Sequence, residues 1–170
     1  MDTLAHGLWG GAVFGQRKDS PYKWAFILGM CPDLFSFGPY FATHLPDIWH
    51  RWTSHQFGRP AHMMIPAYVY HAYNVTHSLV VWAVLFGIVW YWRGKIFWPL
   101  AAWALHILCD IPLHSVRFFP TPYLWPFPTP FYDGNPWAHK TFMLVNYACI
   151  GLTYLGLYVL EKVKKESFLH

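Results

Sequence analysis

Long apolar runs separated by short polar turns make up most of this chain. Residues 61–92 and 141–160 contain no Asp, Glu, Lys or Arg. A helix of about 20 apolar residues can cross the roughly 30 Å hydrocarbon core of a bilayer. The run at 141–160 reaches this length and is followed by the charged sequence EKVKKE. The pattern therefore predicts helices that lie within a membrane.

Five apolar segments follow from this pattern. Each is predicted to be mainly helical, and they cover residues 2–16, 24–44, 70–92, 96–115 and 141–160. The first is too short to cross a bilayer, and we expect it to be a half-helix packed inside the bundle. Pro32 and Pro39 should kink the second. We therefore predict an all-α, polytopic membrane helical bundle with four to five membrane-embedded helices, forming one domain over residues 1–170.

Two segments between the apolar runs have a different composition. Residues 45–68 are mixed and rich in His, Arg, Pro and Trp, which is typical of an interfacial loop, with or without a short helix. Residues 117–139 contain six prolines, which forbid a regular helix. Aromatic side chains, which are also frequent there, suit the headgroup layer of a membrane. This second segment is therefore predicted to form a cap over the outer end of the bundle.

Composition supports the membrane interpretation. Only 12% of the residues are charged and 55% are hydrophobic, whereas soluble chains carry about 25% charged residues. The alternative is an unusually aromatic soluble bundle. The net charge of +4 is not arranged as a basic patch, so we expect membrane lipids and no nucleic acid as partners. The three cysteines are an odd number without a CxxC motif, which argues against a disulfide framework.

Basic residues indicate the orientation of the chain. Eight of them lie at turns that would share one side of the membrane: Arg17, Lys18, Lys23, Arg93, Lys95, Lys162, Lys164 and Lys165. The other four lie on the opposite side. The positive-inside rule places the eight in the cytoplasm of a plasma membrane. The C-terminus would then be cytoplasmic, and the segments 45–68 and 117–139 would face outward.

Five ionisable side chains lie at a similar depth inside the apolar segments: His6, Asp33, His77, His106 and Asp110. Such groups are costly at membrane depth and are functional by default. Each lies ten to sixteen residues from a basic turn, which is roughly 15–24 Å along a helix. Four segments therefore bring His or Asp to one layer. His71 and His114 should lie further out, near the mouth of that layer.

These side chains suit a divalent metal, because imidazoles supply nitrogen ligands and carboxylates offset the charge of the ion. His106 and Asp110 are four residues apart, so they share one helical face and can bind one ion together. Zinc is the first candidate and manganese the alternative, with one or two ions. A membrane histidine can also simply join two helices, and Asp33 can satisfy a backbone donor freed at Pro32. Asp2 is either a further ligand or a helix N-cap, and the cap is favoured.

Several motifs resemble a known family. The stretches TLAHGLWGG, CPDLF, YNVTHSLV, LHILCDIPLH and FFPTPYLWPF are similar to the membrane-bound metal-dependent hydrolases of bacteria and archaea, some of which are described as LexA-binding inner-membrane hydrolases. The resemblance covers residues 2–128. It implies that the same five His and Asp residues bind metal in a prokaryotic plasma (inner) membrane. Two positions differ: Phe35 replaces the second aspartate of PDxD, and the nearest counterpart of an HR pair is the offset His71, followed by Ala72.

The expected function is that of a membrane-bound metal-dependent hydrolase acting on a lipid-like ester or phosphoester. The metal would activate a water, and His114 or His71 would act as general acid or base. Asn74, Thr76 and Ser78 would either support the ligands or merely join helices. Two other functions stay open: a non-catalytic membrane adaptor with a structural metal, and a small transporter with a His/Asp relay. Against the transporter, the chain is short and shows no inverted repeat.

Overall fold

The computed structural model describes residues 1–18, 20–54, 65–128 and 130–167. Its helices are α1 (Thr3–Phe14), α2 (Tyr22–Thr43), α3 (Leu45–Thr53), α4 (Ala67–Thr76), α5 (Leu79–Arg93), the short 3₁₀ helix η1 (Trp98–Leu100), α6 (Ala101–Leu113) and α7 (Lys140–Ser167). The described residues contain no strand, so the predicted all-α class is confirmed. The Pro-rich segment between α6 and α7 has no helix where it is described, as its prolines predict.

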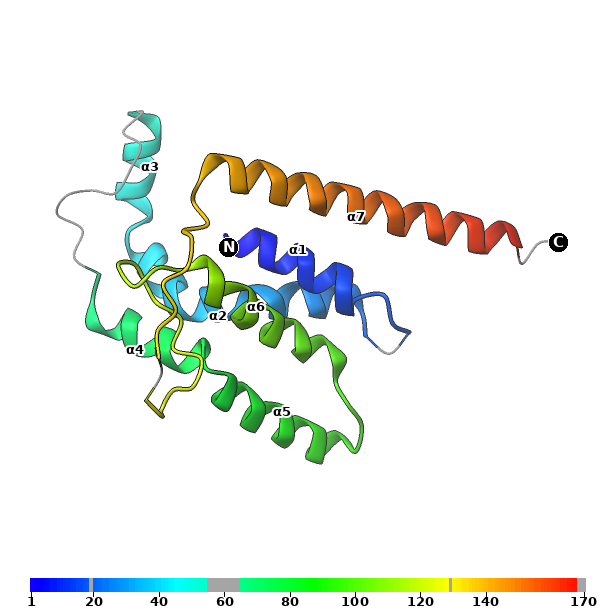
Figure 1. Ribbon diagram of the computed structural model, residues 1–170, viewed down its shortest axis with the longest axis horizontal. Helices are drawn as coiled ribbons and strands as arrows, with labels where there is room; N and C mark the ends of the chain where they lie inside the picture. The colour runs from blue at the N-terminus through cyan, green and yellow to red at the C-terminus, as the bar shows by residue number, and fades with distance from the viewer. Residues whose placement is uncertain (19, 55–64, 129, 168–170) are drawn as a thin grey trace.

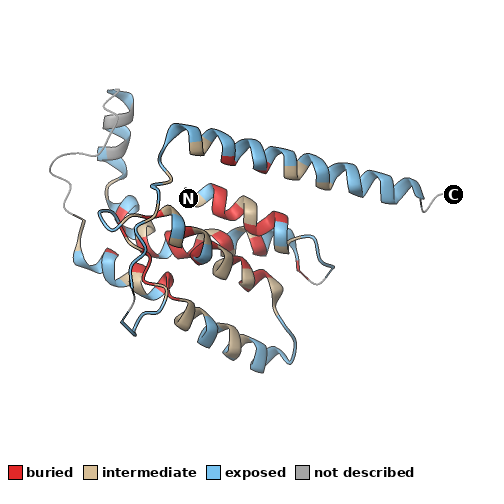
Figure 2. Cartoon of the chain, viewed as in Figure 1, coloured by how far each residue is buried: buried red, intermediate tan, exposed pale blue. Residues whose placement is uncertain are grey.

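Helices α1, α2 and α6 lie at the centre of the molecule (Figure 1). Together with the end of α4 they contain most of the buried residues, and we call these elements the inner bundle (Figure 2). Glycine lets the helices approach closely. A Cβ on Gly10 of α1 would lie 2.7 Å from the Ala25 carbonyl oxygen of α2 and 2.9 Å from Ala102 Cβ of α6. Small residues at such contacts are typical of helices packed within membranes.

Helices α5 and α7 lie on the outside, and we call them the outer helices. The buried residues of α7 are Asn146 and Ile150, and Trp9 of α1 donates its indole N–H to Asn146 Oδ1 at 3.0 Å. Helix α5 has no buried residue. The Trp82 indole N–H ties it to η1, which leads directly into α6, by donating to the Leu100 carbonyl at 2.9 Å. Most of the surface of both outer helices is therefore exposed.

The number of helices that could cross a membrane is smaller than the predicted four to five. Among the described residues, α2 and α7 are long and apolar enough, and α4 with α5 would make a third span despite a bend of 57°. Helix α1 has 12 residues and α6 has 13, so each is only about 20 Å long or less. They are too short to cross on their own, and four to five spans are not supported.

The single helix predicted over 70–92 is wrong, because the structure breaks it at His77 and Ser78. The Ser78 hydroxyl caps α5 by accepting two backbone N–H groups, both at 3.2 Å. It also donates to the Trp125 carbonyl of the Pro-rich segment at 2.5 Å. A serine with these partners stabilises a helix end inside an apolar run. The break makes His77 the C-cap residue of α4.

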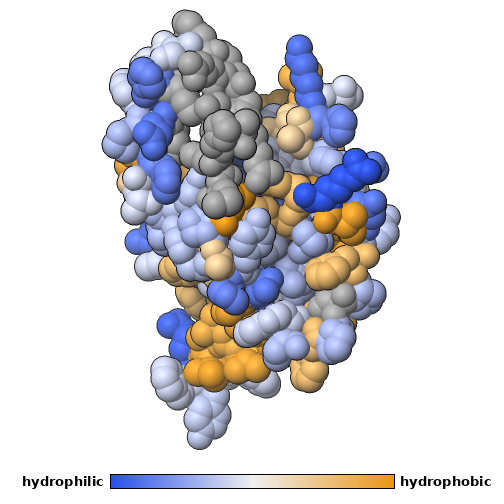
Figure 3. Space-filling model, turned by 90° about the vertical axis from the view of Figure 1, so that its left-hand side faces the viewer, coloured by the Kyte–Doolittle hydropathy of each residue, from blue (hydrophilic) through white to orange (hydrophobic). Residues whose placement is uncertain are grey.

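The basic turns and the Pro-rich segment lie at opposite ends of the molecule. The α1–α2 and α5–η1 connections and the end of α7 share one end, and α3 shares the other with the Pro-rich segment (Figure 1). Seen from that second end, the surface is mostly hydrophilic with separate apolar patches (Figure 3). Backbone N–H groups of Gly134, Asn135 and Trp137 donate to carbonyls at the end of α6, which fixes the segment there. Helix α3 is a short helix within 45–68, of which residues 55–64 lie outside the described part.

Candidate metal centre

Four ionisable side chains meet inside the inner bundle, and we call them the His/Asp cluster: Asp33 of α2, His77 at the end of α4, and His106 and Asp110 of α6. All four are buried, and one ligand atom from each lies within 4.8 Å of the others. The two Nε2 atoms are 3.1 Å apart. Asp33 Oδ1 lies 3.6 Å from each Nε2. Asp110 Oδ2 lies 3.3 Å from Nε2 of His106 and 3.7 Å from Nε2 of His77. This group could hold a metal ion.

The partners of the outward-facing ring nitrogens favour one tautomer of each histidine. His106 Nδ1 lies 2.7 Å from the Gly29 carbonyl oxygen, which can only accept, so Nδ1 carries the proton. The Thr76 hydroxyl donates to the Ala72 carbonyl at 2.9 Å. Its oxygen is then left to accept the Nδ1 proton of His77 at 3.0 Å. In the neutral rings, both Nε2 atoms therefore face the cluster without a proton.

The donor set fits a divalent cation. Two bare nitrogens 3.1 Å apart repel each other unless a positive charge lies among the ligands. Ligand atoms about 2.0–2.2 Å from one tetrahedral ion are roughly 3.3–3.6 Å apart. The five spacings that include a histidine nitrogen are 3.1–3.7 Å, close to this range, and all four ligand atoms lie within 4.8 Å of one another. Asp110 Oδ2 is buried and has no hydrogen-bond partner among the described residues, which is costly without a compensating charge. Metal-binding histidines also usually donate the N–H of the ring nitrogen that does not bind the metal to a nearby acceptor.

His6, the fifth predicted ligand, lies beside the cluster rather than among the four. Its ring stacks on that of His106 with 3.6 Å between centroids, and its Nε2 donates to Asp110 Oδ1 at 2.9 Å. The Met1 amino group donates to the same oxygen at 2.5 Å. These contacts occupy Oδ1 and leave Oδ2 for the cluster. The favoured role of Asp2 is confirmed, because its side chain caps α1 by accepting a backbone N–H at 3.0 Å.

Sequence reasoning missed some residues that support the ligands. The Thr3 hydroxyl donates to Asp33 Oδ2 at 2.7 Å, which leaves Oδ1 for the cluster. The Tyr73 ring stacks on the ring of His77 with 3.8 Å between centroids. Thr3 stands three positions before His6 and Tyr73 four positions before His77. This spacing places each on the helical face of a predicted site residue, and it was the signal that could have identified them.

The two predicted acid–base residues lie in different surroundings. His114 is buried, and its Nε2 lies 3.6 Å from Asp110 Oδ2. Its Nδ1 donates to the Phe119 carbonyl at 2.7 Å, so Nε2 carries no proton in the neutral ring. His71 is exposed on α4 and belongs neither to the cluster nor to the cavity beside it. The geometry thus brings only His114 to the site.

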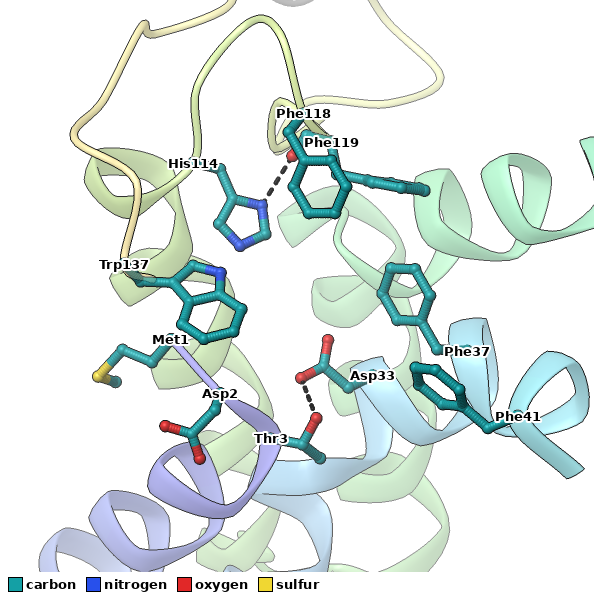
Figure 4. Close-up of a pocket in the computed structure, with 10 residues that line it drawn as sticks. All are labelled: Met1, Asp2, Thr3, Asp33, Phe37, Phe41, His114, Phe118, Phe119 and Trp137. Carbon is teal, nitrogen blue, oxygen red and sulfur yellow. Dashed lines mark hydrogen bonds between the residues drawn. The ribbon is translucent and has the colours of Figure 1, made fainter. Parts of the chain in front are cut away.

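A cavity of about 210 Å³ adjoins the His/Asp cluster. Its lining consists of Met1, Asp2, Thr3, Asp33, Phe37, Phe41, His114, Phe118, Phe119 and Trp137. Asp33 and His114 point into it from opposite sides, and aromatic rings make up much of the wall (Figure 4). Because Asp33 belongs to both the cluster and the lining, the candidate metal centre is next to a space that a ligand can enter.

Comparisons with known proteins add no relative to this description. No family model, no curated protein and no solved structure matches the chain. The site is therefore characterised by its own geometry: a buried His/Asp group that could hold a metal ion, beside an aromatic cavity in an all-helical fold.

Proposed function

We propose that the protein is a membrane-embedded, metal-dependent hydrolase with one divalent ion bound by the His/Asp cluster. The observation that carries this proposal is the convergence of two unprotonated imidazole nitrogens and two carboxylates at spacings suited to a tetrahedral ion. Nitrogen and carboxylate ligands make zinc the first candidate and manganese the alternative. The motifs that resemble membrane-bound metal-dependent hydrolases support the same function.

The residues around the cavity supply the remaining parts of a hydrolytic site. When bound, the ion would supply Lewis acidity that polarises a scissile carbonyl or phosphoryl group and makes water nucleophilic at neutral pH. His114 is the acid–base residue of this proposal. Its Nδ1 is held by the Phe119 carbonyl, so its Nε2 can take a proton from water and return it to the leaving group. The aromatic lining favours a lipid-like ester or phosphoester as substrate.

The proposed location is a prokaryotic plasma membrane. Helices α2 and α7 would cross it, and the bent α4–α5 pair would form a third span. The short α1 and α6 would be embedded without crossing, which brings the number of segments at membrane depth to five. Arg17 lies over the Trp98 ring at 4.2 Å and Arg93 over the Phe97 ring at 4.8 Å. Such pairs suit a cytoplasmic membrane interface, so the cavity would open toward the outer face.

A structural metal in a non-catalytic adaptor is the second candidate. Four buried ligands can form a closed site, which is typical of structural zinc. We favour catalysis because Asp33 also lines the cavity and His114 stands at its edge. The centre is therefore not sealed by protein on all sides.

Elemental mass spectrometry of detergent-purified protein tests the metal centre directly. We expect about one equivalent of zinc or manganese in the wild type and less than about a tenth of that in Asp110→Asn and His106→Ala. Asp47→Asn and His139→Ala are matched controls, because both residues are exposed and lie outside the cluster. Turnover of lipid-like esters or phosphoesters should fall with the metal and return when metal is added back.

Two results would contradict this proposal in different ways. Equal metal content in all variants, including none, would exclude the His/Asp cluster as a metal site. Full metal content without turnover of any ester or phosphoester would favour the structural metal of an adaptor.

A further inference from the structure

The size of the cavity beside the metal centre limits what it can accept. It holds about 210 Å³, whereas pockets for whole drug-sized ligands hold about 300–1,000 Å³. A second cavity of about 240 Å³ shares His114, Phe118 and Trp137 with the first. The two small volumes therefore lie side by side, with Trp137 in the wall of both. This arrangement suits a narrow chain better than a bulky headgroup.

The walls of the first cavity are aromatic from its buried end to the surface. Its aromatic lining residues are Phe37, Phe41, Phe118, Phe119 and Trp137. Phe37 packs edge-on against Phe119 with 5.1 Å between ring centroids. Phe119 is only 5% exposed, whereas Phe41 is 50% exposed. The rings thus form a continuous apolar path from the Asp33 and His114 end to the outside (Figure 4). Burial along this whole path would stabilise a bound acyl chain.

The charges around the two cavities do not suit a phosphate group. Among the described residues that line the two cavities there is no Lys or Arg, and the acidic residues Asp2 and Asp33 line the first. The N-terminus of α1 also faces the first cavity, but Asp2 caps it and offsets its dipole. The Met1 amino group is paired with Asp110. Apart from metal ions, proteins usually bind phosphate through Arg, Lys or uncapped helix N-termini, and the described residues of this lining supply none of these three.

We propose that the substrate is an uncharged long-chain carboxylic ester, with its acyl chain in the aromatic cavity and Trp137 limiting the chain length. This inference rests on the hydrolase function proposed above. In the reaction, the oxygen of water bonds to the acyl carbon and the bond from that carbon to the alkoxy oxygen breaks. The products are the carboxylic acid and the alcohol, which leaves with a proton. The step needs no oxidant, reductant or further reactant.

Substrates that share the same leaving group, p-nitrophenolate, test this substrate class. Metal-loaded protein in detergent is given p-nitrophenyl acetate, octanoate and dodecanoate, together with bis(p-nitrophenyl) phosphate. Each buried methylene is worth about fourfold, so we expect kcat/KM for octanoate to exceed that for acetate by at least about tenfold, with no phosphodiester turnover above the Asp110→Asn background. Trp137→Ala should raise the kcat/KM for dodecanoate relative to that for octanoate, because the two cavities would merge and hold a longer chain. Trp92→Ala on α5, 81% exposed, is the control and should leave the ratio unchanged.

A second readout does not depend on activity. A long-chain ester carrying a photoreactive diazirine is added to metal-free Asp110→Asn protein, and the labelled peptides are identified by mass spectrometry. We expect label at residues 37–41 and 118–137, and competition by the octanoate ester but not by the acetate ester. Label confined to the outer helices would overturn the assignment of the cavity.

The outcomes separate this inference from the function on which it rests. Turnover of the phosphodiester in preference to the octanoate ester would overturn the ester assignment and leave the hydrolase proposal standing. Equal kcat/KM for acetate and octanoate would overturn the role of the cavity as an acyl-chain site. Turnover of no substrate by metal-loaded protein would overturn the hydrolase proposal and the ester assignment together.

Discussion

The inner bundle and the outer helices differ in what they bury. The inner bundle hides polar groups: His77, His106 and Asp110 are each at most 1% exposed. The outer helices present apolar groups instead, with Leu152 of α7 68% exposed and no buried residue in α5. Water-soluble proteins show the opposite tendency, since their buried residues are mostly apolar. The contrast fits a molecule whose outer surface faces hydrocarbon and whose ionisable groups are withdrawn from it.

The two regions are also held by different contacts. In hydrocarbon, apolar side chains gain little from touching each other, so helices associate through close packing and polar contacts. The inner bundle has both, in its glycine contacts and in hydrogen bonds between helices such as that from Thr3 to Asp33. Helix α7 is held by fewer contacts, among them the bond from the Tyr154 hydroxyl to the Leu8 carbonyl at 2.8 Å. We therefore expect changes inside the bundle to cost more than equal changes outside it.

Removal of the metal should have the largest effect and should act first on the inner bundle. A chelator would leave the buried Asp33 carboxylate without a compensating cation and Asp110 with only the Met1 amino group. At free metal 1,000 times Kd, binding adds about 4 kcal/mol to the free energy of unfolding. We expect chelation to lower the thermal midpoint in detergent, followed by circular dichroism, and to increase hydrogen exchange in α1 and α6 before α7. The midpoint of Asp110→Asn should not respond to metal. A wild-type midpoint that ignores the chelator would contradict the proposed centre.

Two glycines offer a matched test of the packing difference. Gly10 of α1 has no room for a Cβ, whereas nothing lies within 4 Å of a Cβ on Gly151 of α7. Gly10→Ala should lower the free energy of unfolding by about 1–3 kcal/mol through overpacking. Gly151→Ala should leave it unchanged or raise it by up to about 1 kcal/mol, because alanine favours a helix. Unfolding in mixed micelles with increasing dodecyl sulfate measures both. Equal losses in the two variants would remove the distinction between the regions.

The fold was predictable where a single physical rule decided the outcome. Apolar length predicted the helices over 24–44 and 141–160, and α2 and α7 confirm them, with α7 continuing through the charged EKVKKE sequence. Depth along the chain predicted that ionisable residues from separate segments would share one layer. Asp33, His77 and the His106/Asp110 pair do meet in the structure.

Contacts between distant residues explain what counting could not predict. Helix α4 ends at Thr76, just before Ser78, whose hydroxyl donates to the Trp125 carbonyl 47 residues further along the chain. His6 has the expected depth, but depth does not give direction, and its Nε2 binds Asp110 Oδ1 instead of facing the cluster. His71 lies on the exposed side of α4, a direction that depth along the chain does not give either. Helical spacing shows which residues share a face, whereas the packing of the bundle decides which face is buried.

The smallest effect that we expect within the inner bundle concerns the hydroxyl of Tyr73. It donates to the Phe119 carbonyl at 3.1 Å and lies 2.9 Å from Nδ1 of His114. Tyr73→Phe removes this hydroxyl and keeps the ring that stacks on His77, so the metal content should stay at the wild-type value. The lost hydrogen bond is worth about 1 kcal/mol, and a loss of that size in the transition state lowers kcat about fivefold.

The control for this change is Tyr91→Phe on α5, where the side chain is 85% exposed and neither kcat nor metal content should change. The two measurements together locate the role of the inner hydroxyl. If Tyr73→Phe loses metal, the hydroxyl supports the geometry of the ligands and not the proton transfer at His114. If kcat and metal both stay at wild-type values, Tyr73 contributes only its ring. A lower kcat at full metal content would instead show that the polar contacts of the inner bundle serve the reaction as well as the fold. The outer helices bury too few of their residues to contribute in this way.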